Sequence, residues 1–316
     1  MTTRMASANR ATIFLLVPIL FTFALAFVFL PSAWAGENIS MLLAKAEAGD
    51  AAAQSSLGAL YYNGQGVPQD FAKAAHWLRL AAHQGYAPAQ FNLGILYDNG
   101  QGIPQDFAKA AYWFRLAARQ GDAPAQAALG GLYQYGQGVP QDYGKSAHWY
   151  RLAARQGNAD AQTNLGWLYD NGLGVLQDYA KAAHWYRLAA KQGYARAQYN
   201  LGWLTADIGA LSLIGRGISQ NDARRIKKNF ARGFHWLRLS ARQGYAEAQF
   251  FLGLIYATGA GVPQDFSKAL HWYRLAARQG DTRAQYNLGW LYYTGQGVPQ
   301  NFTKARHWYR LAAGHH

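Results

Sequence analysis

Apolar residues recur along this chain with the spacing of amphipathic helices, inside a unit that repeats every 36 residues. One clean copy runs over residues 85–120. Its first apolar stripe lies at i, i+4, i+7 and i+8, on one face of a helix: Ala89, Leu93, Leu96 and Tyr97. Pro88 suits the first turn of that helix, and Gly100 suits the left-handed residue that ends it. The pattern predicts a helix between these two residues.

The second half of the unit predicts another helix. A turn-rich segment, residues 100–105, precedes Asp106, whose carboxylate can accept hydrogen bonds from the free N–H groups at a helix start. The helix is expected to end before Gly121, which opens the next copy. A capping residue stands at or near this place in all seven copies: Asp70, Asp106, Asp142, Asp178, Asn221 or Asn229, Asp265 and Asn301. Each copy is therefore a predicted helical hairpin.

Stacking is the way such hairpins bury their apolar faces, since a lone pair of helices cannot do so. Length alone favours two globular domains, but the repeats replace that picture with one array. The predicted fold is all-α, a right-handed superhelical solenoid of seven helix-turn-helix repeats. The predicted segments are a signal peptide (1–35), an N-terminal capping helix (36–48) and a solenoid (49–316) with units at 49–84, 85–120, 121–156, 157–192, 193–243, 244–279 and 280–316.

Two details agree with stacking. Gly58, Gly94 and Gly130 recur inside the predicted first helices, where each costs about 1 kcal/mol relative to Ala, so their recurrence suggests close helix-to-helix contact. In the last unit, Arg306 replaces the apolar residue of the six earlier units, as expected for an outer face that no repeat covers.

The consensus A-x-A-Q-x-x-L-G-x-L-Y-x-x-G-x-G-V-P-Q-D resembles the Sel1-like repeat family, a relative of the tetratricopeptide repeats. Ala125 to Trp149 and Gln162 to Trp185 match it nearly residue for residue. The resemblance implies an adaptor or scaffold, because most members act in that way and many bacterial members are exported. It also implies a concave groove lined by the first helices.

Composition narrows the classes of function. The 30 Lys and Arg residues exceed the 16 Asp and Glu residues, which gives a formal charge of +14. The absence of cysteine excludes disulfides, thiolate metal sites and a cysteine nucleophile. Some cysteine-rich members of the resembling family are linked to β-lactam binding or hydrolysis, so a β-lactamase-like hydrolase is here only a remote alternative. Nucleic acid is not expected as a partner, because the chain lacks a nucleic-acid-binding motif.

The first residues have the features of an export signal. Arg4 and Arg10 precede an apolar run over residues 11–30, and the small residues Ala33 and Ala35 fit a signal-peptidase site. We expect cleavage after Ala35 and a periplasmic or secreted product. The alternative is a retained membrane anchor, since the run is long enough to span a bilayer.

Comparing the seven copies separates framework from variable positions. Counted from the opening glycine, positions 5, 9, 10, 12 and 13 scarcely vary, whereas positions 4, 7, 8, 11, 14 and 15 vary freely and share one sector of the first helix. The variable face carries aromatic and amide side chains, typical of a recognition surface. The candidate groove residues are Phe91, Asn92, Asn164, Trp167, Tyr199, Asn200, Trp203, Phe250, Tyr286, Asn287 and Trp290. They are expected to hold an extended peptide or to stack on sugars; alternatively, the aromatic rings fill gaps between repeats.

Basic residues form two further candidate surfaces. A stripe of Lys, His and Arg follows the second helices, either as a solvated face or as a track for anionic polysaccharide or the envelope surface. Unit five carries an insertion, inferred to lengthen both of its helices so that the hairpin tip protrudes. The predicted basic knob at this tip consists of Arg216, Arg224, Arg225, Lys227 and Lys228. It is either a partner contact or a tolerated insertion.

Catalytic and metal chemistry find little support. Six second helices place His before Trp, but equivalent positions lie about 10 Å apart, too far for nitrogens that share one zinc ion at about 2.1 Å. No His-Glu-x-x-His, P-loop or Gly-x-Ser-x-Gly motif occurs. We expect a non-enzymatic scaffold without cofactor or metal, whose partner is a protein and whose oligomeric state the sequence does not define.

Overall fold

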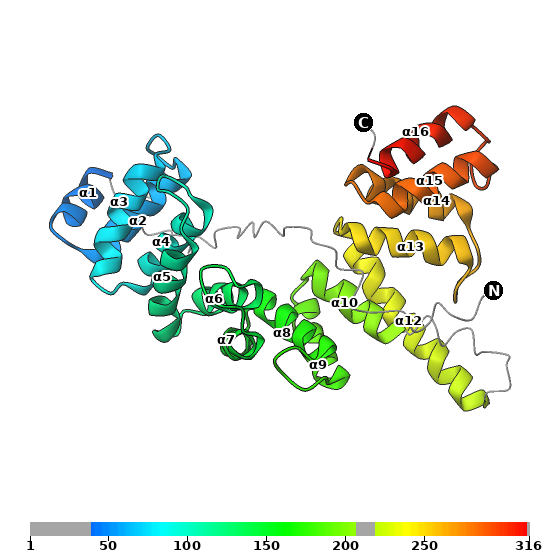
Figure 1. Ribbon diagram of the computed structural model, residues 1–316, viewed down its shortest axis with the longest axis horizontal. Helices are drawn as coiled ribbons and strands as arrows, with labels where there is room; N and C mark the ends of the chain where they lie inside the picture. The colour runs from blue at the N-terminus through cyan, green and yellow to red at the C-terminus, as the bar shows by residue number, and fades with distance from the viewer. Residues whose placement is uncertain (1–38, 207–218, 315–316) are drawn as a thin grey trace. The chain divides into compact units, whose positions relative to one another are not determined.

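The computed structural model describes residues 39–206 and 219–314, and within them it contains fifteen α-helices and no strand (Figure 1). The helices are α1 (Ile39–Glu47), α2 (Ala51–Asn63), α3 (Phe71–His83), α4 (Ala87–Asn99), α5 (Phe107–Arg119), α6 (Ala123–Tyr135), α7 (Tyr143–Arg155), α8 (Ala159–Asn171), α9 (Tyr179–Lys191), α10 (Ala195–Ala206), α12 (Gln220–Arg242), α13 (Ala246–Thr258), α14 (Phe266–Arg278), α15 (Thr282–Thr294) and α16 (Phe302–Ala312). The predicted all-α class is confirmed.

The predicted export segment, residues 1–35, lies outside the described residues. Within residues 39–206 and 219–314, no helix combines the length and the apolar character needed to cross a lipid bilayer.

Helix starts and ends follow the capping chemistry of the sequence. The Asp106 carboxylate accepts a hydrogen bond of 2.9 Å from the Lys109 N–H at the start of α5. Gly100 adopts φ 68°, a left-handed conformation that glycine tolerates, and its N–H donates to the Leu96 carbonyl at the end of α4. Capping side chains are confirmed at the same place in five other repeats: Asp70, Asp142, Asp178, Asp265 and Asn301.

Repeat five departs from this pattern. The prediction that Asn221 or Asn229 caps its second helix is wrong, because α12 starts earlier and is capped by Ser219. The Ser219 hydroxyl accepts a hydrogen bond of 3.0 Å from the Asp222 N–H and donates one of 2.8 Å to the Asp222 carboxylate. As a result α12 has 23 residues, whereas α14 has 13. The predicted lengthening of the second helix is confirmed; the extension predicted for the first helix falls on residues 207–218, outside the described residues.

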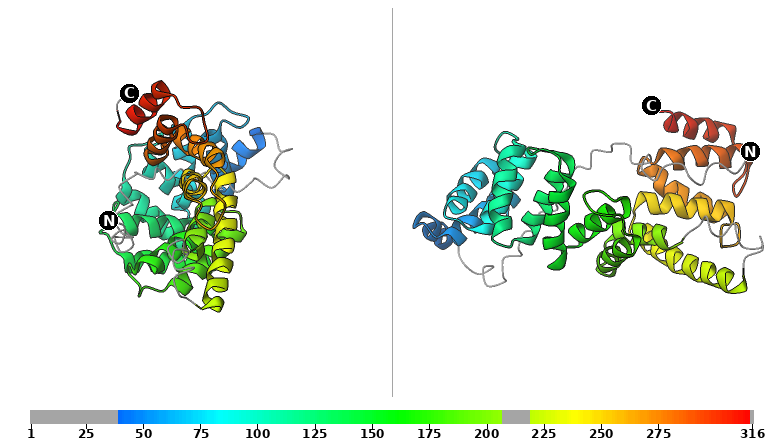
Figure 2. Two further views of the ribbon diagram at one scale, coloured as in Figure 1. Left: turned by 90° about the vertical axis from the view of Figure 1, so that its right-hand side faces the viewer. Right: turned by 60° about the horizontal axis from the view of Figure 1, so that its bottom comes forward.

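The chain divides into two compact units, residues 1–177 and residues 178–316. The division falls inside repeat four, between α8 and α9. In unit 1 each helix from α1 to α8 packs against the next, and in unit 2 the same holds from α9 to α16. The right-hand view of Figure 2 shows α12 (yellow-green) to α16 (red) following one another as a stack of hairpins. Each unit is thus built from neighbouring repeats, as expected for a solenoid.

The terminal elements differ in what covers them. In unit 1, Leu42 and Ala46 of α1 are buried against Leu57 of α2, so α1 covers the apolar side of the first repeat. In unit 2, Arg306 of α16 is exposed, in agreement with its prediction as an outer-face residue.

Wherever both helices of a hairpin lie in one unit, a glycine of the first helix lies directly against a large side chain of the second helix. A Cβ added at Gly130 of α6 would lie 2.7 Å from the Tyr150 ring of α7, and one added at Gly94 of α4 would lie 2.5 Å from the Phe114 ring of α5. No side chain fits at these distances. The glycines therefore give up helix propensity so that a large ring can pack directly on the helix backbone.

Buried glutamines join each repeat to the one before it. Gln90, only 4% exposed, donates from Nε2 to the Ala82 carbonyl of the preceding repeat, 3.2 Å away. Its own Oε1 accepts a hydrogen bond of 2.8 Å from Gln120 Nε2. The same amide pair recurs as Gln54 with Gln84, Gln126 with Gln156, Gln198 with Gln243, and Gln249 with Gln279. Because buried polar groups are costly unless they are paired, this junction fixes how successive repeats meet.

Candidate interaction surface

The first helices of unit 2 carry exposed tryptophans. Trp203 of α10 is 43% exposed and Trp290 of α15 is 37% exposed, and both occupy position 11 of their repeats, counted from the opening glycine. Trp113, a framework tryptophan of unit 1, is only 7% exposed. Large aromatic side chains left open to solvent at an equivalent repeat position are the features that identify this face as a candidate interaction surface.

Aromatic rings from α10 and α13 form one cluster in unit 2. The ring centroids of Trp203 and Phe251 lie 4.6 Å apart, and those of Tyr199 and Phe251 lie 5.8 Å apart. Burial raises the pKa of the Tyr199 phenol above its ordinary value, in keeping with a ring that is packed within the cluster. The cluster combines a partly exposed indole with supporting rings that hold its orientation.

A second cluster surrounds α15. The centroids of Trp290 and Phe266 of α14 are 6.2 Å apart, and those of Tyr286 and Tyr309 of α16 are 5.3 Å apart. Tyr286 and Tyr293 are 58% and 55% exposed, so rings on the open face of α15 rest on rings of the second helices. We refer to Tyr199, Trp203, Phe251, Tyr286, Trp290 and Tyr293 as the aromatic surface of unit 2.

Three of the predicted groove residues are buried. Phe91 (6% exposed) packs on Phe114, with 5.7 Å between ring centroids, and Phe250 (8% exposed) packs on Tyr273, at 6.0 Å. Asn164 is 4% exposed, and its amide donates to the Asp160 carboxylate at 3.2 Å. These side chains serve the interior of their repeats.

The remaining predicted asparagines are half-buried and divide into two kinds. The Asn287 amide donates to the Arg283 carbonyl of its own helix, 3.0 Å away. The side chains of Asn92 and Asn200 make no hydrogen bond among the described residues. Trp167 is also half-buried. The concave shape predicted for this face stays a prediction.

The predicted basic knob lies on the first turns of α12, which extend past α10 and α13 in Figure 1. Four of its residues, Arg224, Arg225, Lys227 and Lys228, are exposed, and the fifth, Arg216, lies outside the described residues. Arg225 is 2.7 Å from the Asp222 carboxylate. The knob therefore includes one cation that already has a partner.

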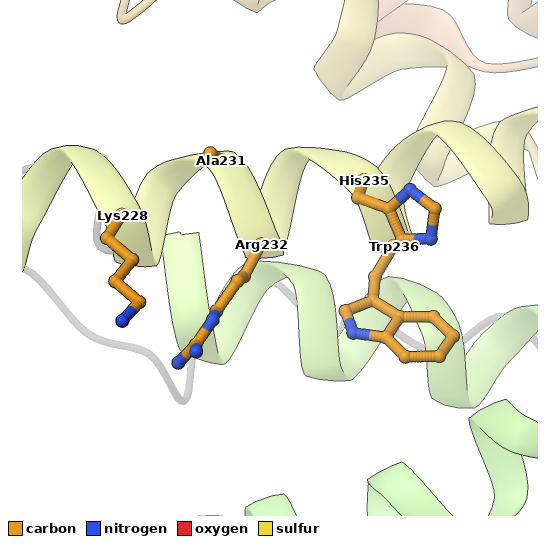
Figure 3. A pocket seen from close by; sticks show the side chains of 5 residues that line it. All are labelled: Lys228, Ala231, Arg232, His235 and Trp236. Atoms are coloured by element: carbon orange, nitrogen blue, oxygen red, sulfur yellow. The ribbon is translucent and has the colours of Figure 1, made fainter.

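An open depression, which we call the α12 strip, continues from the knob along the same helix (Figure 3). It is lined by Lys228, Ala231, Arg232, His235 and Trp236. Arg232 and Trp236 were not among the site residues predicted from the sequence. The signal that could have found them is the missing aspartate three residues before Arg232, where most other repeats have their helix cap.

In the part of the chain that the structure describes, no three His, Asp or Glu side chains lie close enough together to bind a metal ion. The histidines of the second helices are exposed beside their tryptophans, as in His148 and Trp149, whose ring centroids are 5.2 Å apart.

Comparison with known proteins identifies the repeats. The Sel1 repeat model matches seven segments, residues 51–86, 87–122, 123–158, 159–194, 195–245, 246–281 and 282–314. No curated protein matches the chain.

Two solved structures have the same fold as this chain, and more than a third of their aligned residues are identical to those of this chain. The c5321 protein of uropathogenic Escherichia coli, a protective antigen with an SLR fold, is 37% identical, with a TM-score of 0.72 over 88% of this chain and 56% of that one. This chain thus spans little more than half of that relative. A Sel1 repeat protein from Oxalobacter formigenes is also 37% identical, with a TM-score of 0.66 over 87% of this chain and 75% of that one. Proteins of this kind are generally non-catalytic scaffolds for protein–protein interaction. With seven matching repeats and these two relatives, the chain belongs to the Sel1 repeat family.

Proposed function

We propose that this protein is an exported, non-enzymatic scaffold that binds a protein segment through the aromatic surface of unit 2. The observation that carries the proposal is the exposure of Trp203 and Trp290, 43% and 37%, at the same position of two first helices. Exposed tryptophans supported by further rings are typical centres of protein interfaces, because they bury a large area at a small cost in conformational entropy.

The chemistry of the surface favours a peptide with apolar side chains. Rings of Trp203 and Phe251 offer an apolar contact, and the Asn200 amide, which has no hydrogen bond to a described residue, can bind a peptide backbone. An extended chain places alternate side chains on one side, so it can set apolar groups on the rings while its backbone meets the amide.

The test is a measurement of binding to the protein partner. A photo-cross-linker placed beside Trp203 captures the partner, and its affinity is then measured for the wild type and for a Trp203→Ala/Trp290→Ala variant. We expect at least about tenfold weaker binding by the variant and little dependence on salt. A Tyr112→Ala/Tyr179→Ala variant removes two exposed rings from second helices and serves as the matched control.

Equal affinities of the two variants would contradict the proposal, provided that circular dichroism shows both to be folded. Hydrolysis of a chromogenic β-lactam by the purified protein would contradict its non-enzymatic part. Export is tested separately by sequencing the N-terminus of the mature protein, which we expect to begin at Gly36.

A further inference from the structure

The first-turn lysine of the regular second helices is held by two partners. In repeat three, Lys145 Nζ lies 3.1 Å from the Asp142 carboxylate that caps the same helix and 5.5 Å from the ring centre of Tyr133. The same pair of partners holds Lys73, Lys109 and Lys268. These cations are neutralised locally and offer little free charge to a ligand.

Repeat five has lost both partners. Arg232 stands four residues before Trp236, as Lys145 stands four residues before Trp149. The cap position three residues before Arg232 holds Asn229 in the interior of α12. The tyrosine position of the first helix holds Thr205, whose hydroxyl donates to the Leu201 carbonyl. Arg232 consequently has no ion pair within the described residues.

The helix extension adds a second unneutralised cation beside Arg232. Lys228 lies one turn earlier on α12, is exposed, and also has no ion pair among the described residues. The one carboxylate in the sequence of α12 is Asp222, which is 2.7 Å from Arg225. Figure 3 shows the Lys228 and Arg232 side chains on the same side of the helix as the Trp236 ring. Two cations that have no ion pair in the described part of the chain thus share one open strip with an aromatic ring.

We propose that the α12 strip docks an acidic protein segment, at a site separate from the aromatic surface. Residues four apart on a helix are separated by about 6 Å along its axis, so Lys228 and Arg232 match two carboxylates spaced by one helical turn or by two extended residues. The exposed Arg232 guanidinium can form two parallel hydrogen bonds to one carboxylate.

The ring of Trp236 favours a protein over a polysaccharide. It places apolar surface at the end of the cation pair, where a partner with an apolar side chain next to its acidic residues gains contact area. A polyanionic sugar can also stack on a ring, but it carries charges along its whole length and would bind the other exposed cations of the second helices equally well.

The test uses the full chain and a fluorescein-labelled, glutamate-rich peptide that carries one phenylalanine. Lys228→Gln/Arg232→Gln removes the cation pair, and Arg119→Gln/Arg155→Gln removes the same charge from exposed positions of α5 and α7. At low salt we expect about tenfold weaker binding by the strip variant and less than about twofold weaker binding by the control. Both variants alter exposed side chains, so their thermal unfolding should match the wild type.

A third variant, Asn229→Asp, tests the origin of the site without removing a cation. It restores the carboxylate that the regular repeats have three residues before their lysine, and it should pair with Arg232 and weaken peptide binding about threefold.

Four outcomes would overturn the proposal. They are equal losses in the two glutamine variants, unchanged binding by Asn229→Asp, undiminished binding of the peptide with glutamine in place of glutamate, and a strip-dependent affinity for dextran sulfate with none for the peptide. The last outcome would assign the strip to polysaccharide.

Discussion

Repeats three and five share a hairpin framework but differ in what their surface groups contact. In α6 of repeat three, ten of thirteen residues are buried, and the variable positions 7, 8 and 11 hold only Ala127, Ala128 and Gly131. In α10 of repeat five, the same positions hold Tyr199, Asn200 and Trp203, and the tryptophan is 43% exposed.

The second helices show the same contrast. Lys145 of repeat three lies against a carboxylate and a ring, whereas Arg232 of repeat five has neither partner within residues 39–206 and 219–314. Candidate binding groups in repeat five therefore arise in two ways on a framework that is otherwise kept: large side chains replace small ones on the first helix, and a cation of the second helix loses the partners of its equivalents.

The largest effect is expected where the framework of repeat three is tightest. Gly130→Ala puts a Cβ 2.7 Å from Tyr150, a fully buried side chain, and should lower the free energy of unfolding by about 2 kcal/mol. Denaturant titration measures the change. Gly144→Ala is the control, because Gly144 is an exposed helical residue whose replacement should raise stability by about 0.5 kcal/mol. An unchanged free energy of unfolding in Gly130→Ala would show that the two helices of the hairpin can move apart without loss of stability.

The next largest effect on stability is expected in repeat two, where a buried carboxylate oxygen lacks a hydrogen-bond donor in the described part of the chain. The Tyr150 hydroxyl of repeat three donates to Gln134 Oε1 at 3.0 Å, but repeat two has Phe114 in place of the tyrosine and Asp98 in place of the glutamine. Asp98 Oδ1 is buried without a hydrogen bond to any described residue, and burial raises the pKa of this carboxyl to about 6. Since the folded protein then binds the proton more tightly, the free energy of unfolding should fall as pH rises from about 4 to about 6 and level off above that.

Phe114→Tyr supplies the missing donor. At pH 7 it should raise the free energy of unfolding by about 1 kcal/mol, because a hydrogen bond favours the charged carboxylate, and it should flatten the fall between pH 4 and pH 6. Unfolding titrations over this pH range measure both effects. Asp98→Asn should abolish the pH dependence of this position, and a persistent slope in that variant would assign it to another group.

A smaller effect distinguishes the observed cap of α12 in repeat five from the cap predicted from the sequence. Ser219→Ala should lower the free energy of opening of the first turn of α12 by about 1 kcal/mol, since it leaves the Asp222 N–H without its acceptor. Asn229→Ala should leave that turn unchanged, because Asn229 lies in the helix interior. Amide hydrogen exchange in residues 220–223 distinguishes the two, and the opposite ranking would restore the cap predicted from sequence.

The smallest effect concerns the paired and unpaired cations. Lys145→Gln should lower the melting temperature slightly at low salt, and the difference should vanish at high salt as ions screen the Asp142 pair. Arg232→Gln should leave the melting temperature unchanged at every salt concentration. Calorimetry of the two variants over a salt series checks both expectations, and a salt-sensitive loss in Arg232→Gln would reveal a partner of that residue within the chain.

Much of the framework was predictable because it depends on local rules. The period and the glycines indicated the hairpins, and aspartates before the second helices marked their starts in the regular repeats. The rule failed in repeat five because it expected an asparagine as the capping residue, whereas α12 is capped by Ser219, which forms hydrogen bonds with Asp222 three residues later.

Which variable positions are exposed could not be read from one helix alone. The pattern placed Phe91 and Trp203 on the same face, yet their exposures are 6% and 43%. A helical wheel gives direction but not the size of neighbouring residues, and these decide whether a ring is covered. Arg232 was not predicted as a site residue for a related reason. It differs from the equivalent lysines of the regular repeats in lacking a capping carboxylate and a tyrosine ring among the described residues.

The glutamine-to-carbonyl hydrogen bonds at the repeat junctions make the length of the array adjustable. Each junction within a unit is closed by an amide of one repeat and a carbonyl of the preceding one, as for Gln90 and Ala82, and Gln126 and Ala118. Removing residues 121–156 as a block would bring Gln162 to the carbonyl that Gln126 now occupies, with the chemistry of the joint intact. Duplication or loss of whole 36-residue segments would thus produce working proteins of other lengths in one genetic event, and binding surfaces could diversify while the joints stay the same.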